Sequence, residues 1–371
     1  MLNYYIFAEI NFGFLRQRHQ IFADLLKEEF NVHFFERVPS RVPDKLAKRV
    51  WRRFGPREVK STSRSFSEHE GINVRPSYMA PSTNLLFNAY NEKRVNWLLR
   101  DAKPGDIVHL FANSPSVTKV ARTKQCIVVF DIVHNWWNFP YHNFIQRRNI
   151  EEVLGRSDLV VSDSAQTLSM AKQGCSDRDK EFLLLPPGVN EIWFSNRMKN
   201  SYQETNEFKV AFFGNLRANS DLELFRELSS IERTNIEIFG LLDQSLPSDD
   251  YEWLRKFYDG NYNVSDLVNK LETADAIMLP YDRSAFSSSI FPAKYFEAMA
   301  LGKPIISNSQ MAHLPMWNKF IWTSDEVKRL GWESLCRQHY EYRCPQQVKF
   351  ARENSWNGRV QTLKESICSV L

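Results

Sequence analysis

The sequence has no apolar run long enough to cross a bilayer. Its longest runs, such as Ile127–Phe130 and Phe182–Leu185, have the length of a strand, whereas a spanning helix needs about 18 apolar residues. The N-terminal residues lack the basic stretch and cleavage site of a secretory signal. Only five cysteines are present, and an odd, scattered set predicts a reducing compartment rather than a disulfide framework. We therefore expect a soluble, cytoplasmic protein.

Glycine and proline are also scarce and follow no period. The 371 residues include 13 glycines and 16 prolines, which excludes collagen-like and low-complexity chains. Hydrophobic residues make up 43% and charged residues 25% of the chain, as in ordinary globular proteins rather than disordered ones. The length corresponds to about two domains.

Net charge is small, +4 from 48 basic and 44 acidic residues, but basic residues gather in one segment. Between Arg37 and Arg64, ten basic residues accompany two acidic ones, with Trp51 and Phe54 among them. Such a segment suits an anionic membrane surface or an anionic acceptor, although a solvated basic loop has the same composition. At its centre lie Arg49, Arg52 and Arg53. No helix-turn-helix, zinc-finger or RNA-binding signature is present, so we expect no nucleic-acid partner.

Two series of alternating strand and helix patterns divide the chain. The first series predicts a helix over Arg18–Phe30 and strands over Asn3–Ala8, Asn31–Phe35, Ile107–Phe111, Ile127–Phe130, Leu159–Ser162 and Glu181–Leu185. The second predicts strands over Phe208–Phe213, Ile236–Phe239, Ala276–Leu279 and Pro304–Ser307, with helices over Leu222–Ser230, Leu267–Leu271 and Phe291–Leu301. The polar residues 196–206 read as a linker. The sequence thus predicts an α/β protein with two doubly wound domains facing a central cleft.

The stretch Leu279–Ser307 carries the strongest chemical pattern. A strand leads to Tyr281 and a serine-rich loop that contains Ser288 and Ser289, and a helix follows Pro292. Lys294 stands in the first turn of that helix, where the helix dipole disfavours a cation unless a phosphate is bound there. Glu297 follows on the same helix face and is able to accept two hydrogen bonds from a ribose diol. A serine-capped helix with a surface Lys–Glu pair is the alternative interpretation.

This stretch resembles the donor-binding signature of GT-B-fold glycosyltransferases, in particular the family-4-like branch of bacterial polysaccharide and teichuronic-acid assembly. The resembling residues run Pro292-Ala-Lys294-Tyr-Phe-Glu297-Ala-Met-Ala-Leu-Gly302-Lys-Pro304. Four further segments are similar to family motifs and occur in the family's order: Gln17–Gln20, Leu184–Asn190, Phe212–Leu216 and Ala351–Trp356.

The resemblance implies an N-terminal Rossmann-like acceptor domain over residues 1–195, a C-terminal donor domain over 206–350, and a helix over 351–371 that crosses back. It implies transfer of a sugar from a UDP- or GDP-linked donor to a glycan acceptor, which we expect to be lipid-linked, at the inner face of the membrane. It identifies Glu297 as the ribose ligand and Lys294 as the diphosphate cation. The remaining expected donor residues are Gly13, Gly214, Arg217, Tyr281, Ser288 and Ser289. No Asp-x-Asp motif ends a strand, so we expect no metal and no cofactor besides the substrate itself.

For the reacting centre, the strand over Ile127–Phe130 leads to Asp131, His134 and Asn135. A neutral His134 imidazole is suited to accept the proton of an acceptor hydroxyl, with Asp131 as a second candidate for the base or as the group that orients His134. A histidine satisfied within its own loop is the structural alternative. Acceptor or membrane contacts are expected from Arg18, Asn135, Trp136 and Trp137, together with the basic segment's Arg49, Arg52 and Arg53.

The sequence departs from the family pattern at two places. Ser289 stands where retaining members usually carry a second glutamate, and Asn135 stands where an acid usually follows the histidine. Retaining or inverting stereochemistry is therefore left open. A nucleotide-sugar epimerase and a non-catalytic nucleotide-sugar-binding protein are the competing functions.

Overall fold

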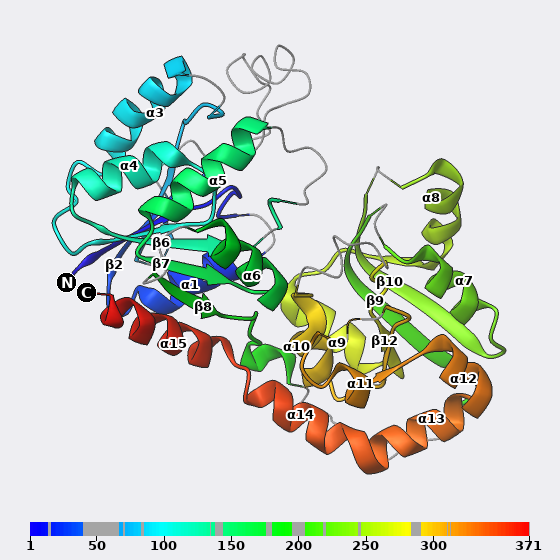
Figure 1. The fold of residues 1–371 in the computed structure, drawn as a ribbon. Coiled ribbons are helices and arrows are strands. Elements are labelled where there is room, and N and C mark those ends of the chain that lie inside the picture. Colours follow the sequence, from blue (N-terminus) through cyan, green and yellow to red (C-terminus); the bar gives the residue numbers. More distant parts are fainter. Residues whose placement is uncertain are drawn as a thin grey trace. The chain divides into compact units, whose positions relative to one another are not determined.

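The computed structural model describes residues 1–13, 16–39, 67–69, 71–82, 85–133, 135–137, 144–175, 180–194, 205–217, 220–243, 246–282, 291–309, 311 and 313–370. Its internal contacts divide the chain into two compact units. Unit 1 comprises Met1–Pro186 and Val360–Leu371, and unit 2 comprises Pro187–Arg359. Each unit is a sheet covered by helices (Figure 1).

Unit 1 is built on a sheet that has eight strands among the described residues, in the order β3-β4-β2-β1-β5-β6-β7-β8. All neighbours pair in parallel except β3 and β4, which are antiparallel. Side chains of the central strands are buried on both faces, as a parallel sheet between helices requires. The strands are β1 (Asn3–Phe7), β2 (Asn31–Glu36), β3 (Ser67–His69), β4 (Ile72–Pro76), β5 (Ile107–Leu110), β6 (Ile127–Ile132), β7 (Leu159–Ser162) and β8 (Glu181–Leu184).

Helices alternate with these strands along the chain and complete unit 1. They are α1 (Arg18–Leu26), α3 (Leu85–Leu98), α4 (Pro115–Thr123), α5 (Phe144–Arg156) and α6 (Ala165–Gly174). The end of the last helix, α15 (Trp356–Ser369), also belongs to unit 1. There Lys364 pairs with Glu29 at 2.6 Å, and the Ser369 hydroxyl donates to Glu181 at 2.6 Å.

Unit 2 has a parallel sheet with six strands among its described residues, in the order β11-β10-β9-β12-β13-β14. The strands are β9 (Phe208–Leu216), β10 (Thr234–Leu242), β11 (Tyr258–Gly260), β12 (Ala276–Met278), β13 (Ile305–Ile306) and β14 (Ile321–Trp322). The α-helices are α7 (Leu222–Ser229), α8 (Ser248–Leu254), α9 (Val264–Glu272), α10 (Lys294–Ala300), α11 (Trp317–Phe320), α12 (Ser324–Leu330), α13 (Trp332–Gln338) and α14 (Cys344–Arg352). Short 3-10 turns, η1 (Glu191–Trp193) and η2 (Arg255–Phe257), and a π-helical turn, η4 (His339–Arg343), complete the unit.

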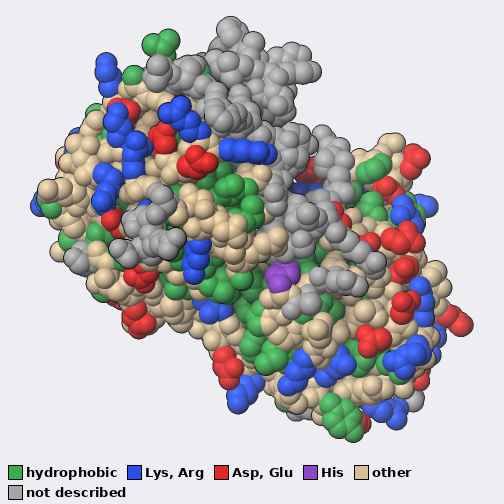
Figure 2. Space-filling model, viewed as in Figure 1, with side chains coloured by type: hydrophobic (Ala, Val, Ile, Leu, Met, Phe, Trp, Pro, Cys, Tyr) green, Lys and Arg blue, Asp and Glu red, His purple; other side chains and the backbone are tan. Residues whose placement is uncertain are grey.

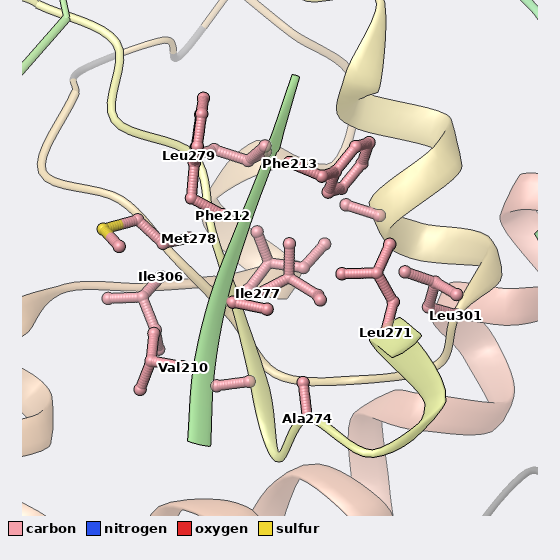
Figure 3. Close-up of a cluster of buried hydrophobic side chains, with 14 of the residues drawn as sticks. Val210, Phe212, Phe213, Leu271, Ala274, Ile277, Met278, Leu279, Leu301 and Ile306 are labelled. Carbon is pink, nitrogen blue, oxygen red and sulfur yellow. The ribbon is translucent and has the colours of Figure 1, made fainter. Parts of the chain in front are cut away.

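The core of unit 2 lies where β9 and β12 meet α9 and α10. Figure 3 shows Val210 and Phe213 from β9 and Ile277 from β12 in one cluster with Leu271 and Leu301. All of them are nearly or completely buried. Because each fully buried side chain of this size contributes about 1.5–3 kcal/mol relative to exposure, this packing fixes where α10 begins beside the sheet.

The predicted α/β class with two Rossmann-like units is confirmed. The elements differ in detail at two places that matter for the site. β9 does not end at Gly214 but continues to Leu216, and α10 begins at Lys294 rather than near Pro292. The first difference arises because β10 pairs with β9 along its whole length, so the ladder carries the strand past the glycine.

Candidate functional site

Two glycines face each other near the carboxyl ends of β9 and β10. Gly214 and Gly240 are register partners with φ values of +109° and +131°, a region that L residues with a side chain rarely adopt. A Cβ added to Gly240 would lie 2.1 Å from the carbonyl oxygen of Gly214. From the other side, the Tyr258 hydroxyl donates to the carbonyl of Gly240 at 3.0 Å. The local backbone therefore requires glycine at both positions.

The side chain of Lys294 lies against Gly214. A Cβ added to Gly214 would be 2.0 Å from Cε and 2.6 Å from Nζ of Lys294. The same Nζ lies 6.0 Å from the centroid of the Phe212 ring. The absence of a side chain at Gly214 thus makes the space that the lysine occupies, and the first residue of α10 brings its ammonium group to the end of β9.

Glu297, one turn along α10, shares this environment with Lys294. Both side chains are half-buried, and within the described residues neither makes a hydrogen bond or an ion pair. Burial raises the pKa of the Glu297 carboxyl to about 7, although the charge of Lys294 opposes this shift. Burial and the neighbouring Arg217 lower the pKa of Lys294, and Glu297 opposes that shift. The pair therefore has hydrogen-bonding capacity that the described protein does not use.

Arg217 and Tyr281 complete the predicted donor residues that the structure brings together. Arg217 is 58% exposed, with Nε 3.9 Å from a carboxylate oxygen of Asp243. Burial and the charge of Glu297 raise the pKa of the Tyr281 phenol, so Tyr281 lies near that carboxyl. A backbone bridge ties Tyr281 to Ser220 just beyond Arg217. Ser288 and Ser289 lie outside the described residues.

A buried polar network occupies unit 1. Arg18 Nε donates to Asp131 Oδ2 at 2.8 Å, and its Nη1 donates to the carbonyl of Leu185 at 2.6 Å. His109 Nε2 lies 3.4 Å from the same Asp131 oxygen, and Tyr4 OH lies 2.8 Å from His109 Nδ1. These groups join β1, β5, β6 and α1 with the residue that follows β8.

The network has a definite charge distribution. Burial raises the pKa of Asp131, but the charge of Arg18 and the hydrogen bond with His109 outweigh it and leave the pKa below its usual value. Burial lowers the pKa of His109, which favours a neutral ring. A neutral ring with Nε2–H toward Asp131 accepts a hydrogen bond from the Tyr4 hydroxyl at Nδ1. Asp131 therefore remains an anion whose partner is Arg18.

Asp163 is an acid that the sequence reasoning missed. It directly follows β7, and burial together with the negative charge of Asp131 raises its pKa to about 8, while Arg18 opposes the shift. The signal that could have found it is positional, because Asp131 and Asp163 both stand at the carboxyl ends of neighbouring buried strands. Ligands of open α/β sheets bind at this edge.

The other residues predicted for unit 1 differ in how far they are exposed to solvent. Asp131, Asn135 and Trp136 have no exposed surface, and Arg18 is 7% exposed, so burial argues against direct contact of these side chains with a substrate in this conformation. Trp137 is half-buried, and Gly13 is exposed with nothing near an added Cβ. Outside the described residues lie His134, Arg49, Arg52 and Arg53.

Within the described part of the chain, no group of three or more His, Cys, Asp or Glu side chains is placed to hold a metal ion. No described helix combines the length and apolar character needed to span a bilayer.

No model of a known protein family matches the sequence, and no curated protein matches it. Solved structures match the fold. HepE (Alr3699) of Anabaena, in complex with UDP and glucose, aligns over 100% of both chains with a TM-score of 0.66 and 13% identity. The apo form of the lipopolysaccharide outer core galactosyltransferase WaaB aligns over 100% of both chains with a TM-score of 0.61 and 13% identity. The chain has the GT-B fold.

The same GT-B architecture extends to a second enzyme class. A Listeria monocytogenes protein described as a UDP-N-acetylglucosamine 2-epimerase aligns over 100% of this chain and 96% of its own, with a TM-score of 0.50 and 12% identity. At these identities the likeness establishes the fold alone, and the reaction has to be argued from the residues.

Proposed function

We infer that this protein is a glycosyltransferase that moves a sugar from a nucleoside-diphosphate sugar to a hydroxyl group of a glycan acceptor, without a metal ion. The observation that carries this proposal is the placement of Lys294 against Gly214, with Glu297 beside it and no hydrogen-bond or ion-pair partner for either among the described residues. A cation and a carboxylate held in this way match the diphosphate and the ribose diol of one nucleotide.

The transfer exchanges one bond at the anomeric carbon of the sugar. The bond from this carbon to the diphosphate oxygen breaks, a bond to the acceptor oxygen forms, and the acceptor proton passes to a base. The departing nucleoside diphosphate gains negative charge, which a positioned cation stabilises in the transition state. Lys294 is proposed for this role with Arg217 as an outer cation, and Glu297 accepts hydrogen bonds from the ribose hydroxyls.

His134 is the proposed base. Asp131 is not proposed for that role, because it has no exposed surface and its charge is compensated by Arg18. Asp131, three residues before His134 in the sequence, instead binds Arg18, and their ion pair links the start of α1 to the end of β6. Full turnover of a His134→Ala variant would show that His134 is not the base.

The fold neighbours and the sequence support a proposal for the acceptor and for where the protein acts. HepE was solved with UDP and glucose, and WaaB is described as a lipopolysaccharide galactosyltransferase, which supports a UDP-linked donor and a lipid-linked glycan acceptor in polysaccharide synthesis. The basic residues between Arg37 and Arg64 support a peripheral position at the inner face of the membrane.

A thermal-shift panel of nucleoside diphosphates and nucleotide sugars tests the donor site. A nucleotide at 100 times its dissociation constant stabilises the folded protein by about 2.7 kcal/mol. Lys294→Ala and Glu297→Ala should abolish most of this response, whereas Lys349→Ala, an exposed lysine of α14 in the same unit, should respond like the parent. If all three variants respond equally, the donor site lies elsewhere.

Epimerisation of the donor is the second candidate, favoured by the fold similarity to the epimerase of Listeria. It predicts conversion of a UDP-sugar with no acceptor present. Sugar transfer requires an acceptor, so incubation of the protein with UDP-N-acetylglucosamine alone separates the two. Nucleotide binding with neither reaction would identify a non-catalytic nucleotide-sugar-binding protein.

A further inference from the structure

Helix α3 exposes several large apolar side chains to solvent. Leu86, Tyr90 and Trp97 are 82%, 46% and 45% exposed, and they recur at helical spacing on one face. The exposed residues of this face, which we call the α3 stripe, are Leu86, Ala89, Tyr90, Lys93, Asn96, Trp97 and, in the turn after the helix, Arg100. In the space-filling view, hydrophobic and basic side chains both reach the surface at α3 (Figure 2). The stripe combines apolar and basic side chains and contains no acidic one.

The opposite face of α3 fixes this orientation. Val95 and Leu98 are buried in the core of unit 1. Buried Asn91 exchanges two hydrogen bonds with the backbone of Ala80, from Nδ2 to the carbonyl and from the amide to Oδ1, both at 2.8 Å. Rotation of the helix to bury the stripe would break both bonds and expose the apolar face, so the stripe is held toward solvent.

Cations surround the aromatic residues of the stripe. The Arg94 guanidinium lies 4.4 Å from the ring centroid of Trp97 and 5.3 Å from that of Tyr78, and the Arg100 guanidinium lies 4.7 Å from Trp97. The Arg94 Nε donates to the carbonyl of Ser77 at 2.8 Å, which anchors the cluster to the end of β4.

Acidic groups near the stripe cancel only part of this charge. Glu92 on α3 pairs with Lys119 of α4 at 2.8 Å, and Asp101 lies 3.4 Å from Arg100. Lys93, between Tyr90 and Trp97, has no ion pair within the described residues. The stripe and its border are therefore net positive.

This composition favours a lipid surface over a protein partner. Protein interfaces are enriched in Trp, Tyr and Arg but depleted in Lys at their centres. A helix that lies on a membrane places Trp and Leu in the interface and Lys and Arg beside them, and Trp and Tyr concentrate at the membrane–water boundary. Lys93 and Arg100 beside Leu86, Tyr90 and Trp97 match the second pattern, because the long basic side chains reach the headgroups while the apolar ones insert.

We propose that the α3 stripe docks unit 1 on an anionic phospholipid bilayer, with Leu86, Tyr90 and Trp97 inserted at the headgroup level and Lys93, Arg94 and Arg100 against the lipid phosphates. The chain supplies further charge nearby. The Ser77 hydroxyl donates to the carbonyl of Arg37 at 3.1 Å, and Arg37 opens the basic part of the sequence. The inference rests on the proposed function only in that docking would bring the protein to a lipid-linked acceptor. Docking itself requires no sugar transfer.

Sedimentation of the full chain with phosphatidylcholine vesicles, with and without phosphatidylglycerol, tests the docking. The parent should bind only the anionic vesicles. Lys93→Gln should weaken this binding about fivefold, from about 1 kcal/mol per basic residue at the surface. The double variant Tyr90→Ser/Trp97→Ser should weaken it roughly tenfold or more. The matched control is Tyr342→Ser/Ile192→Ser, two exposed apolar positions of unit 2, and it should bind like the parent.

A second measurement reports insertion without removing a stripe residue. An environment-sensitive fluorophore on Ala89→Cys, in a Cys368→Ser background, should shift to the blue on anionic vesicles, and the same label on Gln361→Cys of α15 should not. The proposal is overturned if the Ala89 label does not respond, or if the stripe variants bind like the parent while Arg49→Glu/Arg52→Glu/Arg53→Glu does not. It is also overturned if the stripe variants dissociate a dimer, since the occupant is then a second copy. The nucleotide thermal shift in the same variants keeps a failure of docking distinct from a failure of the donor site.

Discussion

Substitution of Gly214 by alanine gives the sharpest test of the donor site. The new methyl group would lie 2.0 Å from Cε and 2.6 Å from Nζ of Lys294, well inside van der Waals contact. The obstacle is the far end of a flexible side chain, so the lysine moves and the strand stays. The ammonium group is then displaced from the end of β9, which is where the diphosphate is proposed to bind.

The expected magnitudes separate stability from binding. An alanine held at the φ of +109° found for Gly214 costs about 1–3 kcal/mol, and for a unit of this size each kcal/mol lowers Tm by about 2–4 °C. Loss of a hydrogen bond from a charged group costs about 1.5–3 kcal/mol. Since 1.36 kcal/mol is a factor of ten, the affinity for a UDP-sugar should fall roughly 10- to 150-fold. The two losses are of similar size, and they are measured separately, one as a change in affinity and the other as a change in Tm.

Calorimetric titration with UDP-glucose, in a double-mutant cycle with Lys294→Ala, supplies the assay. Gly214→Ala should weaken binding strongly in the parent but little in the Lys294→Ala background, because the displaced group is already absent. Equal losses in both backgrounds would refute the reasoning, since the effect of the methyl group would then not pass through the lysine. Circular dichroism of each variant confirms that the protein titrated is folded.

Three further predictions concern other parts of the two units. Gly240→Ala should destabilise the protein far more than Gly214→Ala in thermal melts, because its methyl group would lie 2.1 Å from a backbone oxygen that has no room to move; similar melting temperatures would contradict this. UDP-glucose affinity should rise as the pH rises through about 7, because Glu297 then becomes a carboxylate. It should fall again at alkaline pH, where Lys294 loses its proton below the usual lysine pKa. Glu297→Gln should remove the rise and Lys294→Arg should remove the fall, and a flat profile for the parent would exclude both roles. Arg18→Met leaves Asp131 buried without its cation and should lower the free energy of unfolding in denaturant by about 3–5 kcal/mol, without weakening nucleotide binding. Arg18→Met/Asp131→Leu should recover much of this loss. An unchanged unfolding midpoint for the single variant would show that the pair does not stabilise the fold.

The fold was predictable from the sequence because the hydrophobic pattern and the positions of turns and loops agree. Short apolar runs alternate with amphipathic segments in two series, and a buried parallel sheet needs that arrangement. The strand over Ile72–Pro76 escaped prediction although Ile, Asn, Val and Arg alternate as in a half-buried strand, because the run has only five residues and ends in a proline. Pairing with β2 on one side and β3 on the other makes it a strand, and local pattern carries no trace of those partners.

The placement of the proposed donor residues was predictable in part, and the missing part is backbone geometry. Lys294 and Glu297 stand out by their spacing, and Gly214 by the end of an apolar run. Gly240 also ends an apolar run, but nothing in the sequence indicates its pairing with Gly214, which brings the two backbones close together. A glycine at the end of a strand has the same sequence appearance whether it turns the chain or makes room for a neighbouring side chain, and only the register distinguishes the two.

The two polar clusters show why charge in the sequence does not by itself identify a ligand site. Arg18 and Asp131 lie far apart in the chain and give no local sign of partnership. In the fold, however, Arg18 donates one hydrogen bond to Asp131 and a second to the carbonyl of Leu185. Lys294 and Glu297 lie one turn apart and resemble an ordinary surface pair, yet within the described part of the chain neither makes an ion pair. Burial without a partner costs free energy that folding alone does not return. A nucleotide bound as proposed would form hydrogen bonds with both groups and recover that cost, so these two residues are expected to contribute more to binding than to folding.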